Sequence, residues 1–259
     1  MKLKFQPRKR FGQHFLRDET IIDRMMALIA PQSSQCFVEI GPGLGVLTQV
    51  LLPLVKHLDV IELDRDLIPQ LKILCENLGD ITIYQADALK FDFNVLVKTN
   101  EKLRAVGNLP YNISSQLLFH LLKYAEHIQD MYFMLQKEVV DRLVAQAGQK
   151  AYGRLGVMIQ YYCEVEKLFD VLPEAFSPRP KVNSAFVKLV PHQTLPYQAK
   201  DFNKFAEVVK LAFMQRRKTL RNALKTIITT EQLEKIGIDP KLRPEQITIE
   251  QYVKIADGV

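Results

Sequence analysis

The sequence has 259 residues, of which 47% are hydrophobic and 25% are charged. The composition excludes wholesale disorder, and the length fits one large α/β domain or one such domain plus a small appendage. The apolar stretches are too short to cross a bilayer. The formal net charge of +6 favours a polyanionic partner, although many proteins with such a charge bind no anion.

The cysteines Cys36, Cys75 and Cys163 are far apart and have neither disulfide nor metal-binding spacing. This usage is typical of a reducing compartment, so we expect a cytoplasmic protein with no metal site. The basic segment Met1 to Arg17 lacks the apolar stretch of a secretory signal, and we expect it to belong to the mature protein.

Short apolar runs alternate with helical patterns in the first two-thirds of the chain, which indicates βα units and a largely parallel sheet. An amphipathic helix is expected first, at Thr20–Ile29. The expected strands are Cys36–Ile40, Leu58–Glu62, Ile81–Gln85, Arg104–Gly107 and Met131–Leu135. The helical patterns between them are Leu44–Val55, Arg65–Leu78 and Ser114–Tyr124.

A helix at Leu155–Tyr162 and two strands, at Cys163–Leu172 and Ala185–Val190, complete the expected sheet. Beyond a linker at Pro191–Lys200 the pattern is purely helical. The expected helices are Phe202–Met214, Lys218–Thr226, Glu231–Ile236 and Ile249–Ala256. We therefore predict an α/β domain over 1–192 and a small all-helical domain over 193–259.

A glycine-rich turn, Gly41-Pro42-Gly43-Leu44-Gly45, separates the first expected strand from a helix. Its spacing differs from the dinucleotide fingerprint, because Val46 stands where the third glycine of that fingerprint would be. It resembles the cofactor loop of Rossmann-like S-adenosylmethionine methyltransferases, although such turns also occur for purely structural reasons.

Two acids end the next two expected strands, Glu62 directly and Asp87 two residues beyond. Glu62 could accept hydrogen bonds from both ribose hydroxyls of an adenosine moiety, and Asp87 could accept one from the adenine amino group. A single acid at a strand end is commonly a helix cap. Here Gly41, Glu62 and Asp87 follow consecutive strands, so they converge on the edge where open α/β sheets bind ligands.

The tetrapeptide Asn108-Leu109-Pro110-Tyr111 ends the fourth expected strand. An exocyclic amine such as adenine N6 is a poor nucleophile, because its lone pair is delocalised into the ring. The Asn108 side-chain oxygen and the Leu109 carbonyl could accept from its N–H groups, while Pro110 stiffens the turn. Tyr111 offers an aromatic face for an extruded base. A strand-ending turn with a packed tyrosine would use the same residue types.

Together these motifs resemble the ribosomal RNA adenine N6,N6-dimethyltransferase family. Two flanking segments extend the resemblance: Arg10-Phe11-Gly12-Gln13-His14-Phe15-Leu16 and Phe176-Ser177-Pro178-Arg179-Pro180-Lys181-Val182. It runs from about Arg8 to Leu224, with the motifs in the family's order. Within the family, residues 108–114 and the helical tail are most similar to the bacterial small-subunit enzymes associated with kasugamycin sensitivity.

The resemblance implies a Rossmann-like methyltransferase sheet that uses S-adenosylmethionine as methyl donor. It also implies dimethylation of N6 of two adjacent adenosines near the 3′ end of small-subunit (16S) rRNA, and a role in small-subunit biogenesis. The implied partner is 16S rRNA within the small subunit or its precursor. We expect a monomer with no membrane partner.

The resemblance also implies roles for individual residues. The implied cofactor-binding residues are His14, Leu16, Gly41, Gly43, Glu62, Asp87 and Asn108. The implied catalytic residues are Asn108, Leu109, Pro110, Tyr111 and Phe176, with Phe176 near the target base. Without the motifs around them, His14 and Phe176 would be read as structural residues. The expected RNA-binding residues lie in two basic clusters: Arg8, Lys9, Arg10, Arg216, Arg217, Lys218 and Arg221.

Two alternatives stay open from the sequence. The first is an adenine N6-methyltransferase acting on large-subunit rRNA, of the macrolide-resistance type, which shares most of these motifs. The second is a non-catalytic assembly or transcription factor that keeps the same fold. A dinucleotide oxidoreductase is disfavoured by Val46.

Overall fold

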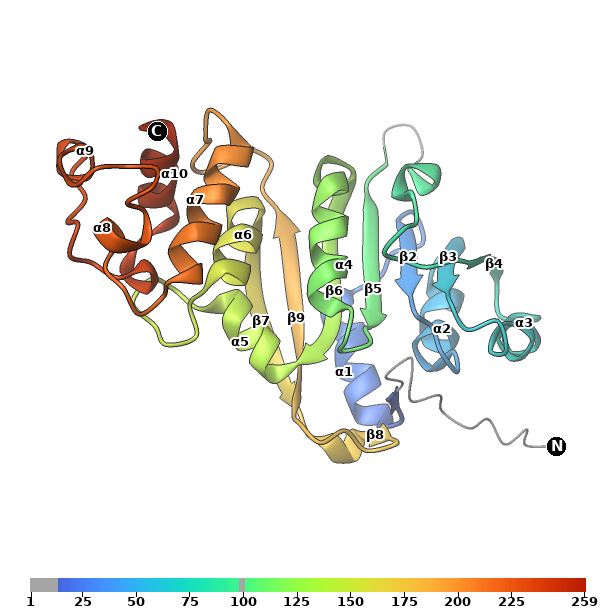
Figure 1. The fold of residues 1–259 in the computed structure, drawn as a ribbon. Coiled ribbons are helices and arrows are strands. Elements are labelled where there is room, and N and C mark those ends of the chain that lie inside the picture. The colour runs from blue at the N-terminus through green and yellow to red at the C-terminus, as the bar shows by residue number, and fades with distance from the viewer. Residues whose placement is uncertain (1–13, 98–100) are drawn as a thin grey trace. The chain divides into compact units, whose positions relative to one another are not determined.

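The computed structural model describes residues 14–97 and 101–259. They form two compact units (Figure 1). The first unit contains the described residues up to 140 together with 166–191, and the second contains 141–165 together with 192–259. The chain therefore passes into the second unit twice, whereas the sequence analysis expected a single division after residue 192.

The first unit is built on a seven-stranded sheet with the order β4-β3-β2-β5-β6-β9-β7. The five strands from β4 to β6 are parallel, and β9 is antiparallel to β6. Their bounds are β2 Cys36–Ile40, β3 His57–Glu62, β4 Asp80–Gln85, β5 Leu103–Asn108, β6 Ile128–Gln136, β7 Cys163–Val171 and β9 Ser184–Pro191. The chain order reverses between β2 and β5, and such switch points are where open α/β sheets bind ligands.

The predicted α/β class is confirmed, and each of the seven expected strands is present within a few residues of its expected bounds. The helices of the first unit are α1 Glu19–Ile29, α2 Val46–Leu51, α3 Ile68–Cys75 and α4 Ser114–Leu121. Proline explains why α2 is shorter than predicted. Pro53 has no backbone N–H, so the α-helix ends at Leu51 and a 3₁₀ turn, η2 Leu52–Leu54, follows. Two further 3₁₀ segments, η3 Phe93–Leu96 and η4 Leu122–His127, flank β5 and α4.

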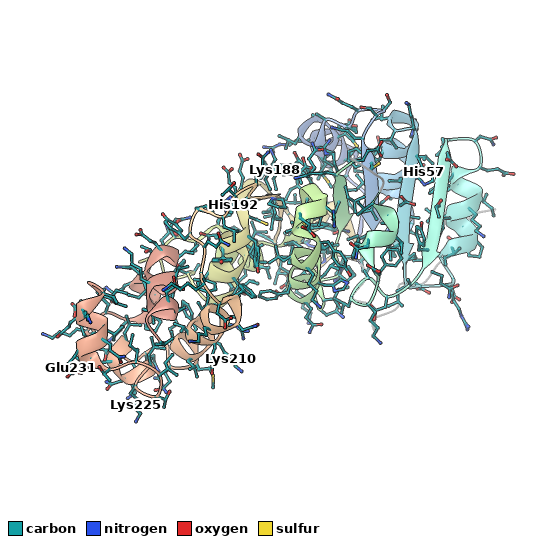
Figure 2. The ribbon with its side chains drawn as sticks, turned by 90° about the horizontal axis from the view of Figure 1, so that it is seen from above. His57, Lys188, His192, Lys210, Lys225 and Glu231 are labelled. Carbon is teal, nitrogen blue, oxygen red and sulfur yellow. The ribbon has the colours of Figure 1, made fainter. Side chains whose placement is uncertain are left out.

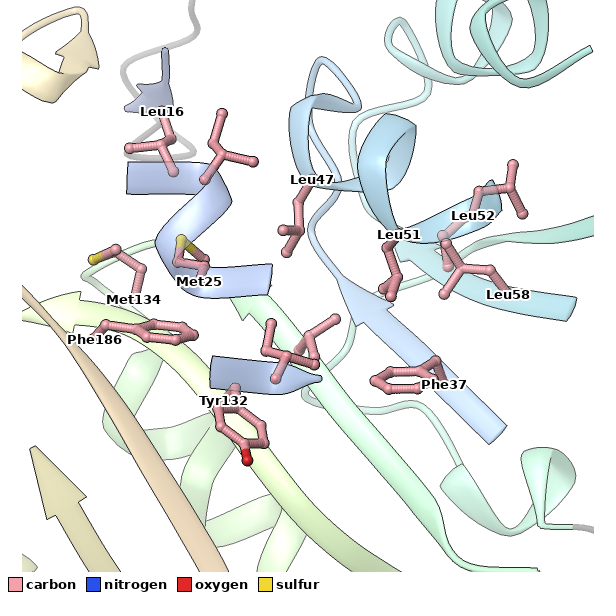
Figure 3. Close-up of a cluster of buried hydrophobic side chains, with 14 of the residues drawn as sticks. Leu16, Met25, Phe37, Leu47, Leu51, Leu52, Leu58, Tyr132, Met134 and Phe186 are labelled. Atoms are coloured by element: carbon pink, nitrogen blue, oxygen red, sulfur yellow. The ribbon is translucent and has the colours of Figure 1, made fainter. Parts of the chain in front are cut away.

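A cluster of buried apolar side chains fills the space between α1, α2 and the sheet (Figure 3). Met25 of α1 and Leu47 of α2 meet Phe37 and Tyr132 of the strands there. Leu16 and Phe176, from the two flanking motifs, belong to the same cluster. The core therefore supports the carboxyl edge of the sheet from one face.

A second sheet has only two short strands, β1 Phe15–Leu16 and β8 Phe176–Ser177. They pair antiparallel, with Phe15 opposite Ser177 and Leu16 opposite Phe176. Arg17 extends the contact by donating its N–H to the Ala175 carbonyl at 2.8 Å. A short 3₁₀ turn, η5 Pro173–Ala175, precedes β8. This ladder brings together the two flanking motifs, which are far apart in the sequence.

The second unit is helical, apart from the first residues of β7. Its helices are α6 Arg154–Tyr162, α7 Phe202–Met214, α8 Leu220–Ala223, α9 Thr230–Lys235 and α10 Ile249–Asp257, with a 3₁₀ turn, η6 Pro244–Gln246. One helix that the sequence analysis missed, α5 Lys137–Val144, follows β6. Buried aromatic side chains such as Tyr152, Phe205 and Tyr252 form the interior, while Lys210, Lys225 and Glu231 are exposed (Figure 2). Among the described residues, no helix has the length and apolar character needed to cross a membrane.

Candidate active site

A pocket of about 330 Å³ lies at the carboxyl ends of β2, β3 and β5, next to the switch point. Most of the predicted cofactor and catalytic residues line it: His14, Leu16, Gly41, Gly43, Glu62, Asp87, Asn108, Leu109, Pro110 and Tyr111. They come from four strand ends and from the N-terminal motif. Parallel strands present their carboxyl ends at one edge, and this is why residues so distant in the sequence converge.

The glycine-rich turn forms one wall of the pocket and requires its glycines. Gly43 has φ +60°, a left-handed conformation that favours glycine. A Cβ atom at Gly43 would lie 2.9 Å from the Phe15 ring, and one at Gly45 would lie 2.4 Å from Leu74. The turn therefore packs closely on its neighbours, and its backbone is exposed to the pocket without side-chain obstruction.

Glu62 is buried at the end of β3, and both of its carboxylate oxygens accept backbone hydrogen bonds. Oε2 accepts from the Gly43 N–H at 3.0 Å, and Oε1 accepts from the Asp64 N–H at 2.8 Å. Burial raises the pKa of this carboxyl group. The carboxylate is thus held in one orientation beside the glycine turn. Asp87 is held more simply, since its Oδ1 accepts from the Leu89 N–H at 3.0 Å.

Glu39 is a pocket residue to which the sequence analysis gave no role. It lies within the apolar strand β2 and is only 2% exposed. Its Oε2 accepts a hydrogen bond from the Thr48 hydroxyl at 2.6 Å. Burial raises its pKa to about 7. A carboxylic acid in the middle of an apolar strand was the signal that could have identified it.

Asn108 ends β5, and its side chain is oriented by the N-terminal motif. Its Nδ2 donates to the His14 main-chain carbonyl at 2.8 Å. A carbonyl oxygen can only accept, so this bond fixes which end of the amide is nitrogen and sets the direction of Oδ1. The next residue, Leu109, is buried, and its N–H donates to the Met134 carbonyl at 3.2 Å. The turn after β5 is therefore anchored on both sides.

Tyr111 is half-buried, and two groups hold its ring. The hydroxyl lies 2.6 Å from the hydroxyl of Ser184, at the start of β9. The ring stacks on the His14 imidazole, with centroids 5.6 Å apart and planes inclined by 26°. His14 Nδ1 lies 2.7 Å from the Pro178 carbonyl, so Nδ1 carries a proton in this tautomer. Burial raises the pKa of the Tyr111 phenol, which therefore stays neutral near pH 7.

Two groups of predicted site residues lie away from the pocket, and a third falls outside the described residues. Phe176 is 4% exposed and packs in the buried cluster instead of lining the pocket that the described residues form. Arg8, Lys9 and Arg10 lie outside the described residues. In the second unit Arg216, Arg217, Lys218 and Arg221 are exposed. Arg216 differs from the others, because its Nη2 donates to the Lys150 carbonyl at 2.5 Å and its Nε lies 3.7 Å from Glu245.

The donor and acceptor pattern of the pocket fits an adenosine-containing ligand. Glu62 and Asp87 present carboxylate acceptors at neighbouring strand ends, as a ribose diol and an adenine amino group require. The glycine turn leaves main-chain atoms open to close approach. Apolar side chains such as Leu16 and Ile40 supply surface for a flat ring. Asn108 and Tyr111 stand at the same pocket with an amide acceptor and an aromatic ring.

Comparisons with known proteins agree with this geometry. The family model described as ribosomal RNA adenine dimethylase matches residues 4–259. The ribosomal RNA small subunit methyltransferase A of Hahella chejuensis is 54% identical over 254 residues, which cover 98% of this chain and 93% of the relative. The protein of the same name from Marinomonas sp. is 51% identical over 252 residues, which cover 97% of this chain and 95% of the relative.

Two solved structures resemble this chain over more than nine-tenths of its length. A dimethyladenosine transferase from Plasmodium falciparum superposes with a TM-score of 0.79 at 26% identity, covering 93% of this chain and 96% of the other. The 23S rRNA methyltransferase ErmE superposes with a TM-score of 0.74 at 23% identity, covering 94% of this chain and 98% of the other. At that identity the likeness to ErmE is one of fold.

Proposed function

Because this chain belongs to the ribosomal RNA adenine dimethylase family, we propose that it dimethylates N6 of two adjacent adenosines near the 3′ end of small-subunit (16S) rRNA. The observation that carries this proposal is sequence identity. Over nearly the whole chain, more than half of the residues are identical to those of relatives named as small-subunit methyltransferases. Its partner is then 16S rRNA within the small subunit or its precursor. The reaction places the protein in small-subunit biogenesis.

When bound, S-adenosylmethionine would supply a methyl group attached to a sulfonium sulfur. As N6 forms its bond to the methyl carbon the C–S bond breaks, S-adenosylhomocysteine leaves as a neutral sulfide, and the cationic N6 then releases its proton to solvent. Glu62 would hold the ribose hydroxyls, since its carboxylate is already oriented by Gly43 and Asp64. Asp87 would accept from the adenine amino group of the cofactor. The backbone at Gly41 and Gly43, together with His14 and Leu16, would border the rest of the molecule.

Asn108 acts as the acceptor for the target amine. Its Oδ1 and the Leu109 carbonyl would each accept one N–H, and this favours a pyramidal nitrogen with its lone pair aimed at the methyl group. An amide cannot usefully take a proton, so Asn108 is not a base. The excellent leaving group makes a strong base unnecessary, and orientation supplies much of the effect. Tyr111 provides the ring on which the flipped adenine stacks.

Phe176 has a supporting role in this proposal. It is buried in the cluster that also contains Leu16, and the two residues pair across the β1–β8 ladder. Its position therefore favours holding the N-terminal motif in place over touching the base. Pro110 stiffens the turn between the amine acceptor and Tyr111.

The exposed basic side chains of the second unit would bind RNA phosphates. Arg217, Lys218 and Arg221 are the strongest candidates there, because Arg216 is already engaged with Lys150 and lies near Glu245. We assign the same role to Arg8, Lys9 and Arg10, and RNA binding to 193–259 as a whole. A cytoplasmic monomer fits this function.

The direct test supplies labelled S-adenosylmethionine and undermethylated small subunits, with undermethylated large subunits in a parallel reaction. Mass spectrometry then maps the modified bases. We expect dimethyladenosine at two adjacent positions near the 3′ end of the small-subunit RNA. Modification confined to the large subunit would instead support the macrolide-resistance type of activity, and no methylation of either would support a binding protein.

A further inference from the structure

Ser184 contacts the proposed catalytic machinery without lining the pocket. It is the first residue of β9, is 0% exposed, and lies opposite Gln136 of β6. Its hydroxyl is 2.6 Å from the Tyr111 hydroxyl. Buried hydroxyls require hydrogen-bond partners, and here each hydroxyl supplies the partner of the other.

The bond to Ser184 restrains the Tyr111 ring at its hydroxyl. The stacked His14 imidazole, whose own position is fixed by the Pro178 carbonyl, is a further restraint. Ser184 and Pro178 lie on the segment that leads from β8 into β9, and His14 lies on the N-terminal motif. The ring is therefore held at its hydroxyl end and on one face by parts of the chain distant from residue 111.

We propose that Ser184 is a positioning residue for methyl transfer: by holding the Tyr111 hydroxyl it fixes the plane of the ring on which the target adenine stacks. This inference rests on the proposed function of the pocket. It also explains why position 111 carries a tyrosine. A phenylalanine would present the same aromatic face but could not be tethered.

The physical basis is preorganisation. An adenosine that leaves its RNA stack has already lost stacking and pairing energy. A ring that is fixed in advance adds no ordering cost when the base arrives, and it holds N6 in line with the methyl group. If the tether is cut, the ring still stacks but samples other tilts, so fewer bound adenines are aligned for attack.

A double-mutant cycle tests the proposal, with Ser184→Ala, Tyr111→Phe and the combined variant. The measurement is the single-turnover rate of methylation at saturating small subunit. Loss of one hydrogen bond corresponds to about a two- to tenfold decrease, and we expect this from each single change. The combined variant should be no slower than the slower single variant, because both changes remove the same bond.

Controls separate positioning from a general structural effect. Ser34→Ala makes the same change at an exposed serine before β2 and should leave the rate unchanged. Cofactor affinity, measured by calorimetry, should stay at the wild-type value in Ser184→Ala, because Ser184 does not line the pocket. A reduced rate with normal cofactor affinity is the expected signature.

Three results would overturn the proposal. The first is a wild-type rate in Ser184→Ala. The second is an equal loss from Ser184→Ala in the wild-type and Tyr111→Phe backgrounds, which would mean that Ser184 acts without Tyr111. If Ser184→Ala does not fold, Tyr111→Phe alone tests the same bond, and a wild-type rate there would be the third. Failure of the proposed function itself is distinct, because the wild-type protein would then methylate no small subunit.

Discussion

The pocket of the first unit and two helix starts of the second are held in different ways. In the first unit three of the bonds around the pocket join distant residues: Asn108 with His14, His14 with Pro178, and Tyr111 with Ser184. In the second unit α9 and α10 begin with side chains that bond three residues away. Thr229 with Gln232 and Thr248 with Gln251 each form a reciprocal capping box.

A helix start and the pocket therefore depend on different numbers of residues. A capped helix start needs only its own few residues, so its loss is a local cost in stability. A pocket assembled from distant segments needs the sheet and both flanking motifs at once, so a single broken contact disturbs function more than stability. A substitution in a helix cap should therefore be measured by the free energy of unfolding, and a substitution around the pocket by the reaction rate or the binding affinity.

The largest effect is expected at Asn108. Asn108→Ala removes the acceptor that matters most as N6 becomes pyramidal, so the single-turnover rate should fall about a hundredfold or more, as for other preorganised transition-state partners. Asn94→Ala, at an exposed asparagine of η3, is the matched control. If Asn108→Ala is folded and methylates at the wild-type rate, the amine-acceptor role is wrong.

Glu39 should make stability depend on pH. Its pKa is about 7 in the folded protein, against an ordinary value of 4.5. Between these values the unfolded chain has released the proton and the folded protein has kept it. The free energy of unfolding should therefore fall as the pH rises through this window, by about 3 kcal/mol.

Glu39→Gln should remove this part of the pH dependence and leave a more stable protein at pH 8. Urea unfolding of both proteins across pH 4.5 to 8 measures how the free energy of unfolding changes with pH. The control Glu207→Gln, at an exposed glutamate of α7, should show the same change with pH as the wild type. If the free energy of unfolding changes with pH equally in wild type and Glu39→Gln, burial does not raise the pKa of Glu39.

Glu62→Ala should weaken cofactor binding by about ten- to a hundredfold, since hydrogen bonds to a charged acceptor are lost. The Gly43 and Asp64 N–H groups also lose their acceptor, so the glycine turn loses its orientation. Calorimetry with the purified variant measures the affinity. Glu76→Ala, at an exposed glutamate after α3, should bind normally, and unchanged affinity in folded Glu62→Ala would remove this residue from the site.

In the second unit, replacing Arg217, Lys218 and Arg221 together by Gln should weaken binding to the small subunit and flatten its salt dependence. Each lost phosphate contact reduces the log–log slope by about 0.7 to 0.9. Cofactor affinity should not change. The same change at Lys210, Lys235 and Lys241, also exposed in this unit, is the control. Equal slopes in both triple variants would mean that the basic cluster has no special role.

The smallest effect is expected from a local cap. Thr248→Ala removes the side chain that accepts from the Gln251 N–H at the start of α10, and it should cost about 1 kcal/mol of unfolding free energy. The single-turnover rate should be unchanged. Thr226→Ala, at an exposed threonine after α8, should cost less. A slower reaction in Thr248→Ala would contradict the expectation that a local helix cap affects stability but not the reaction rate.

The same distinction explains what could be predicted from the sequence. The bounds of β2 and α7 match the expectation, because an apolar run and the cap Asp201 are local signals. The convergence of Gly43, Glu62 and Asn108 was also predictable, because it follows from parallel strand topology. The roles of these residues came from the resemblance of their motifs to a known family, because a position at a strand end does not by itself define a role.

The remaining features depend on contacts that no local pattern records. The strands β1 and β8 have two residues each, too few for periodicity, and only their pairing defines them. Ser184 reads as an ordinary strand serine until Tyr111 is placed beside it. Phe176 carried a family motif, yet its burial in the core cluster follows from where β8 lies in three dimensions.

The β1–β8 ladder also bears on biosynthesis. Phe15 and Leu16 are translated long before their partners Ser177 and Phe176, which follow only after most of the sheet has been made. At ordinary elongation rates this interval is about 10 to 30 seconds. The nascent chain must therefore keep two apolar residues uncovered while the strands form in order. The contacts of Pro178 with His14 and of Ser184 with Tyr111 likewise form only late in synthesis, after every residue that lines the pocket has been made.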